Sequence, residues 1–184
     1  MAVKVFEPDE IRKAINIMKP DNELFEIRCH ESDRRIHSGY FRSADTAFEA
    51  LRALNPASGN IYITLNHIND SCYSRGQRDR FIMNAKPTTS DTDIDGYEFL
   101  FVDADPRRSA GVSSSDEQVQ QAKETGNRVY AFMKNLGFNE PVTAMSGNGI
   151  HLLYRIRLKN NKENEELIKK CLKVLDMFFS TDDV

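Results

Sequence analysis

The stretch that decides the fold is Tyr97-Glu-Phe-Leu-Phe-Val-Asp-Ala-Asp105, an apolar run that ends in two aspartates one residue apart. If the run is a strand, residues two apart point to the same face, so Asp103 and Asp105 project together at its carboxyl end. Mg²⁺ and Mn²⁺ prefer oxygen ligands, usually one or two carboxylates completed by water and substrate phosphates. The pair therefore predicts a Mg²⁺ or Mn²⁺ site that acts on a phosphate compound.

A second motif, further along the chain, reads Ser146-Gly147-Asn148-Gly149-Ile150-His151. We expect a tight turn in which both glycines can adopt positive φ and expose backbone N–H groups. By itself this is simply a hairpin turn. His151, however, follows at once in an apolar strand, where an imidazole needs a partner or a functional role. With the acidic pair, the motif suits a triphosphate whose oxygens a metal bridges while the imidazole and N–H groups hold the rest.

The acidic pair has a competing structural explanation. Two carboxylates that face the same way repel each other unless a cation or an arginine offsets their charge. Arg107 and Arg108 follow the pair directly and could neutralise it without metal, or could instead reach a phosphate.

Composition narrows the class of protein. The chain has 184 residues, 40% of them apolar, and no long apolar run or charged-then-apolar leader, so we expect one globular body with no membrane partner. Its three cysteines are far apart, which argues against a disulfide framework or a zinc knuckle and fits a reducing cytoplasm.

The net charge of −3 gives no global attraction to nucleic acid. A local basic cluster can still bind a phosphate backbone, although a solvated charged face is the simpler interpretation. Such a cluster is formed by Arg75, Arg78, Arg80 and Lys86, of which Arg75, Arg78 and Lys86 are the candidates for nucleic-acid contact.

Hydrophobic periodicity and capping residues predict a mixed α/β (α+β) fold with two modules, residues 1–96 and 97–184. In the first module we expect helices over 8–18 and 44–54, strands over 24–29, 36–41 and 60–66, and a long connection over 67–96 with a short helix near 74–81. In the second we expect strands over 97–102, 141–145 and 150–156, and helices over 115–136 and 162–179.

The second module has the order β-α-β-β-α, which is five of the six elements of a ferredoxin-like unit. The last strand is missing, so we expect the chain to be a fragment of a longer protein. In such a unit the first and third strands are neighbours, which would bring Asp103, Asp105 and His151 onto one surface.

Several motifs, in order, resemble the primase-polymerase domain of the archaeo-eukaryotic primase superfamily, in the branch found on plasmids, phages and other mobile elements. The resemblance covers roughly residues 58–180. It rests on Ile61-Tyr-Ile-Thr-Leu-Asn66 leading to Arg75, Lys86-Pro-Thr-Thr-Ser-Asp91, Phe99-Leu-Phe-Val-Asp-Ala-Asp-Pro-Arg-Arg108 with Ala110-Gly-Val-Ser-Ser114, and Ser146-Gly-Asn-Gly-Ile-His-Leu-Leu-Tyr154.

The resemblance implies that Asp103 and Asp105 bind the catalytic divalent metals and that His151, with Ser146 nearby, contacts the phosphates of the incoming nucleotide. It also implies an amino-terminal α/β module joined to a module similar to an RNA-recognition motif. The expected function is a DNA primase-polymerase that joins nucleoside triphosphates on single-stranded DNA, with a helicase domain as a possible companion in the parent chain. Nucleotide contacts are expected from Ser146, Gly147, Asn148, Gly149, His151, Arg108 and Lys86.

The chain departs from the family pattern in one respect. The family has a third acidic residue on a later strand, whereas here Asp176 falls in a predicted helix and Asp182 and Asp183 lie at the very end. Two alternatives therefore stay open: a noncatalytic nucleic-acid-binding module of a replication protein, and a metal-dependent nuclease.

Overall fold

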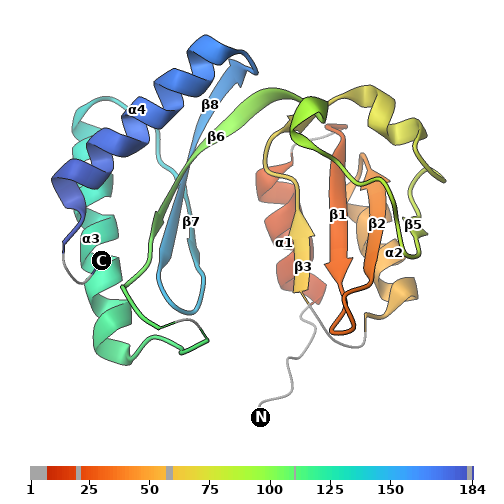
Figure 1. Cartoon of the computed structure of the whole chain (residues 1–184), viewed down its shortest axis with the longest axis horizontal. Coiled ribbons are helices and arrows are strands. Elements are labelled where there is room, and N and C mark those ends of the chain that lie inside the picture. The colour runs from red at the N-terminus through yellow and green to blue at the C-terminus, as the bar shows by residue number, and fades with distance from the viewer. Residues whose placement is uncertain (1–7, 20–21, 57–59, 110, 182–183) are drawn as a thin grey trace. The chain divides into compact units, whose positions relative to one another are not determined.

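The computed structural model describes residues 8–19, 22–56, 60–109, 111–181 and 184. The chain divides into two compact units, Met1–Gly96 and Tyr97–Val184, and each is described by itself. The fold is mixed α and β, with antiparallel sheets (Figure 1). None of the described helices combines the length and the apolar character needed to cross a bilayer.

The first unit contains a four-stranded sheet with the strand order β3-β1-β2-β5. Residues of β1 and β2 pair as an antiparallel hairpin, from Phe25↔Phe41 to His30↔Ile36. Ile15 of α1 and Leu51 of α2 pack with the apolar residues on one face of this sheet. The elements of this part are α1 (Pro8–Met18), β1 (Phe25–His30), β2 (Ile36–Phe41), α2 (Ala44–Leu54) and β3 (Asn60–Ile63).

Local sequence signals explain why α2 keeps its predicted bounds. The Ser43 hydroxyl accepts a hydrogen bond from the Asp45 N–H, and Asn55 ends the helix in the left-handed conformation. The thiols of Cys29 and Cys72 are buried, as expected for cysteines that pack as small apolar groups.

The connection after β3 differs from the expectation. It contains two short strands and two short 3₁₀ helices, and the predicted helix over 74–81 was wrong. In its place, β5 pairs with β2 through Ser38↔Ile82 and Gly39↔Phe81. A two-residue strand is too short to show an alternating pattern of apolar and polar residues. It forms because the neighbouring strand supplies its backbone hydrogen bonds. The elements are β4 (His67–Ile68), η1 (Asp70–Ser74), β5 (Phe81–Ile82) and η2 (Asp91–Asp93).

The second unit has the predicted order β-α-β-β-α. The sheet that contains its strands has the order β4-β6-β8-β7, so β6 and β8 are neighbours as expected for the first and third strands of the unit. By sequence, β4 and the first residues of β6, up to Gly96, belong to the first unit. The short strand β4 pairs with the first residues of β6, Ile94 and Gly96. The elements are β6 (Ile94–Ala104), α3 (Asp116–Asn135), β7 (Val142–Met145), β8 (Ile150–Lys159) and α4 (Lys162–Phe179).

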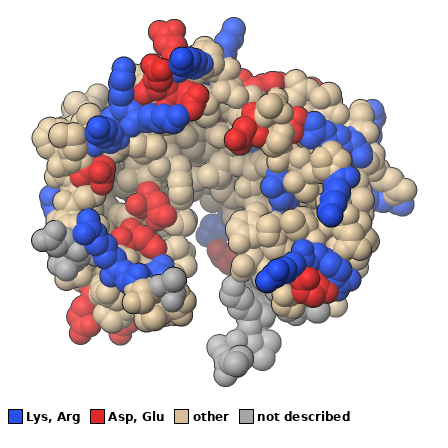
Figure 2. Space-filling model, viewed as in Figure 1, with Lys and Arg blue, Asp and Glu red and all other residues tan. Residues whose placement is uncertain are grey.

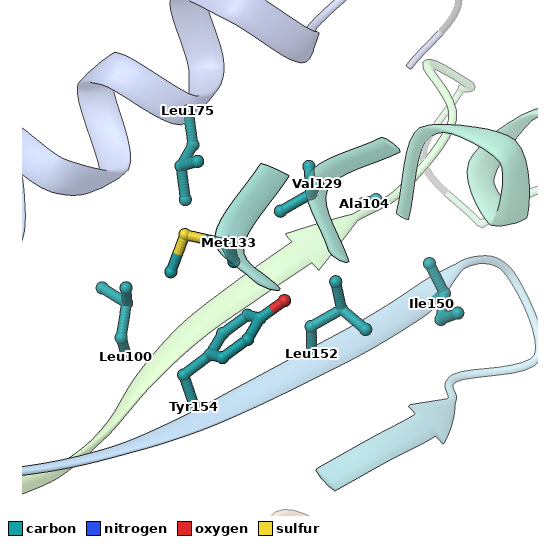
Figure 3. Close-up of a cluster of buried hydrophobic side chains, with 8 residues drawn as sticks. All are labelled: Leu100, Ala104, Val129, Met133, Ile150, Leu152, Tyr154 and Leu175. Atoms are coloured by element: carbon teal, nitrogen blue, oxygen red, sulfur yellow. The ribbon is translucent and has the colours of Figure 1, made fainter. Parts of the chain in front are cut away.

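One face of this sheet is covered by α3 and α4. Figure 3 shows side chains from both strands pointing toward the two helices; they are Leu100, Ala104, Ile150, Leu152 and Tyr154, against Val129, Met133 and Leu175. Since side chains alternate along a strand, Asp103 and His151 lie on the face that these helices do not cover.

Candidate active site

The centre of the candidate site is the contact between Asp103 and His151. Asp103 is the last exposed residue of β6, and His151 is the second residue of the neighbouring strand β8. Their side chains face each other, with the His151 Nε2 atom 3.3 Å from the Asp103 Oδ1 atom. The imidazole also meets the Phe101 ring edge-on, with 5.0 Å between ring centroids. Strand pairing therefore fixes an acid and an imidazole side by side.

The environment of Asp103 raises the pKa of its carboxyl group above the ordinary value. Partial burial is the largest cause, and the negative charge of Asp105 adds to it, while His151 and Arg108 act in the opposite direction. A carboxylate that is costly to keep charged gains from a nearby cation. A positive charge close to Asp103 would therefore favour the charged form of its carboxyl group.

Asp105 lies just after β6 and is held by Arg108. The Arg108 Nη2 atom donates to the Asp105 Oδ2 atom at 2.8 Å, and Nη1 donates to the Val112 carbonyl oxygen at 3.2 Å. The other oxygen, Oδ1, is buried and makes no hydrogen bond to any described residue. The arginine explanation weighed from the sequence therefore applies to Asp105, whereas Asp103 is paired with His151.

The turn after β7 is built around the Ser146 hydroxyl group. This oxygen accepts hydrogen bonds from the N–H groups of Asn148, at 3.2 Å, and Gly149, at 2.9 Å. Of the two glycines, only Gly147 has a positive φ, at +87°. Gly147 thus uses the freedom expected of both glycines. The expectation that the turn exposes its N–H groups was wrong for Asn148 and Gly149, because the Ser146 hydroxyl accepts from both.

Gly149 has a different reason to be glycine. A Cβ atom at this position would lie 2.2 Å from the Ala104 carbonyl oxygen and 2.5 Å from the Asp105 Oδ1 atom. The turn thus packs directly against the acidic end of β6. On its other side the Asn148 Oδ1 atom accepts from the Ser114 N–H at 3.1 Å, which ties the turn to the loop before α3.

Asp103 and Asp105 are both among the residues that line a pocket of about 450 Å³, whose walls also include residues of α3 and α4 but not His151. Arg107 and Asp176 also line it, and neither was predicted as a site residue. The Asp176 Oδ1 atom accepts from the Ser180 hydroxyl at 2.6 Å. Nothing in the sequence indicates that Asp176 lies at this pocket, because only the packing of α4 brings it there. Across the described ranges, no group of three or more His, Cys, Asp or Glu side chains is arranged to hold a metal ion.

The residues predicted to contact nucleic acid belong to the first unit. Arg75 makes a two-pronged ion pair with Asp93, with nitrogen–oxygen distances of 2.7 and 2.5 Å. Arg78 stacks over the Tyr73 ring at 5.1 Å, and Lys86 is exposed. Arg75 therefore also has a structural role. On the face that Figure 2 shows, basic and acidic side chains are interspersed within each unit, in agreement with the small net charge.

Comparisons with known proteins give no match. No protein-family model matches the chain, and searches of curated proteins and of solved structures found no significant similarity.

Proposed function

We propose that this chain is the catalytic domain of a DNA primase-polymerase, which joins nucleoside triphosphates on a single-stranded DNA template. One observation carries the proposal: the Asp103 carboxylate, with its raised pKa, lies 3.3 Å from the His151 imidazole at the end of β6, two residues before Asp105. The resemblance of these motifs to the primase-polymerase domain supports the choice of reaction. An RNA-recognition-motif-like arrangement of the second unit is part of the same proposal.

The residues fit a divalent cation that arrives with its substrate. Mg²⁺ usually keeps several waters and is held by one or two carboxylates together with substrate phosphates, so a complete protein cage is unnecessary. Asp103 and Asp105 would supply these carboxylates. The buried Asp105 Oδ1 atom, which has no hydrogen-bond partner among the described residues, is an oxygen that such a cation could satisfy.

Each side chain has a distinct task in nucleotidyl transfer. A bound cation would offset the negative charge that develops on the α-phosphate when a primer hydroxyl attacks it and pyrophosphate leaves. Asp103 and Asp105 would hold this cation at the end of β6. His151, already aligned by Asp103 and Phe101, can donate a hydrogen bond to a phosphate oxygen.

Arg108 can play two successive roles. Without substrate it neutralises Asp105, to which it donates at 2.8 Å. Because a guanidinium matches phosphate oxygens as well as carboxylates, it can transfer to the triphosphate when a cation takes its place at Asp105. The Ser146–Gly149 turn would then act mainly by packing against Asp105 and fixing its position, since the Ser146 hydroxyl already accepts from two of the turn's N–H groups.

Template-directed incorporation tests the proposal. The protein should extend a primed single-stranded DNA with Mg²⁺ or Mn²⁺, and Asp103→Asn should remove this activity. Asp116→Asn is a matched control, because Asp116 is an exposed acid in the first turn of α3 in the same unit. Equal incorporation by the wild type and Asp103→Asn, or none by the wild type, would contradict the proposal.

A noncatalytic nucleic-acid-binding module is the second candidate. The Asp105–Arg108 ion pair favours it, because this pair satisfies one oxygen of the second acid without any metal. Template binding that is unaffected by Mn²⁺, in a protein that incorporates no nucleotide, would support this candidate. Shortening of the primer in place of extension would indicate a metal-dependent nuclease.

A further inference from the structure

A small pocket in the first unit lies outside the candidate active site. It has a volume of about 270 Å³ and is lined by Arg28, His30, Tyr62, Ile63 and Thr64. This volume is below the roughly 300–1,000 Å³ typical of pockets for drug-sized ligands. It suits a single planar ring rather than a larger molecule.

Strand alternation explains why an aromatic ring is exposed here. Ile61 and Ile63 of β3 pack into the core beneath the sheet, so Tyr62 between them points to the opposite face. Tyr62 is 50% exposed to solvent. The ring lies against His30 of β1, with 4.9 Å between centroids. In the ladder Tyr62 is paired with Arg28, so the two side chains leave the same face of the sheet.

The Arg28 side chain is fixed in place by buried groups. Its Nε atom donates to the Glu26 Oε2 atom at 2.8 Å, and its Nη2 atom donates to the Thr89 carbonyl oxygen. Glu26 is itself fully buried and accepts from the Ser38 hydroxyl and, at 3.2 Å, from the Thr89 N–H. Arg28 therefore lines the pocket with its guanidinium already held in one position, and ordering this side chain on binding costs little.

We propose that this pocket binds a nucleobase of single-stranded DNA by stacking it on Tyr62, with Arg28 at its edge. Aromatic rings and guanidinium planes are the groups on which proteins stack unpaired bases. Glu26 already balances the charge of Arg28, so the pocket offers little net attraction to a phosphate. Recognition therefore falls on the base. The choice of ligand rests on the proposed function, but the pocket is independent of Asp103.

The absence of tryptophan from the chain permits a direct test. Tyr62→Trp introduces a single tryptophan, which can be excited selectively, at the stacking position; Phe178→Trp, at a residue 65% exposed in α4, is the matched control. Oligothymidylate should quench the fluorescence of Tyr62→Trp to saturation and leave that of Phe178→Trp unchanged. An abasic strand of equal length, which keeps the phosphates, should not quench. Tyr62→Ala should bind oligothymidylate about tenfold more weakly.

The opposite results would overturn the inference. These are equal quenching by the abasic strand, quenching by a proline-rich peptide but not by DNA, or unchanged affinity of Tyr62→Ala with an unchanged thermal unfolding midpoint. Combining Tyr62→Trp with Asp103→Asn separates the two proposals. Quenching should persist in the double variant, because the pocket does not depend on Asp103. If Tyr62→Trp is quenched but the wild type incorporates no nucleotide, the polymerase proposal fails while the base-binding pocket stands.

Discussion

Replacing Gly149 by alanine should damage the site from the turn side. The added Cβ atom would lie 2.2 Å from the Ala104 carbonyl oxygen, 2.5 Å from the Asp105 Oδ1 atom and 3.0 Å from the Asp105 Cα atom. Even close carbon–oxygen contacts in proteins are about 3.3 Å or longer. Since two of the three atoms belong to the backbone, the turn and the end of β6 must separate by about 1 Å.

The size of the effect follows from this displacement. Overpacking of this kind costs about 1–3 kcal/mol in the free energy of unfolding. A misplacement of about 1 Å in a catalytic group costs about 100-fold in rate. We therefore expect Gly149→Ala to lower the free energy of unfolding by about 2 kcal/mol and the rate of nucleotide incorporation by about 100-fold.

Gly137→Ala is the matched control for the loss of stability. Gly137 has φ +87° and no neighbour within 4 Å of its Cβ position, so alanine there should cost about 1–2 kcal/mol in backbone strain without moving Asp105. Urea unfolding and primer extension measure the two quantities. The reasoning is refuted if Gly149→Ala incorporates nucleotides as fast as Gly137→Ala.

Three further predictions concern pH, burial and competition for Asp105. The Arg75 guanidinium holds the pKa of Asp93 well below its ordinary value of 3.8. The ion pair therefore stabilises the folded state fully above about pH 4, and this stabilisation is lost as the pH falls through the lowered pKa. Asp93→Asn should lower the urea midpoint near neutral pH, and the deficit should shrink in acid; a constant deficit would contradict this. Burial raises the pKa of Tyr154 to about 12, and its hydroxyl has no hydrogen bond within the described chain. Tyr154→Phe should therefore raise the free energy of unfolding by about 1 kcal/mol, and a loss would count against it. Arg108→Met should tighten Mn²⁺ binding without nucleotide, measured by electron paramagnetic resonance, because the arginine competes for Asp105; weaker binding would argue otherwise.

Elements with their own local signals were predictable from the sequence. The helix α4 has the predicted bounds, Lys162–Phe179, because apolar residues repeat at helical spacing from a capping Asn161. The two-residue strands β4 and β5 could not be predicted, since each forms only where a partner strand supplies its hydrogen bonds. The extension of β6 back to Ile94 likewise depends on its pairing with β4.

The site was predictable where it depends on strand geometry. Alternation along β6 and the neighbouring position of β8 were enough to place Asp103 beside His151. Contacts made by loops were not predictable. The capture of turn N–H groups by Ser146 and the close approach of Gly149 to Asp105 depend on how the loops fold back onto the sheet.

The most direct test of the central claim is paramagnetic broadening of the histidine ring signals by Mn²⁺ in nuclear magnetic resonance. The chain has four histidines, so His30, His37 and His67 serve as internal references for His151. If a cation binds at Asp103, trace Mn²⁺ should selectively broaden the His151 signals, and Asp103→Asn should abolish the effect. Unchanged His151 signals, or equal broadening in the wild type and Asp103→Asn, would contradict a cation site at the end of β6.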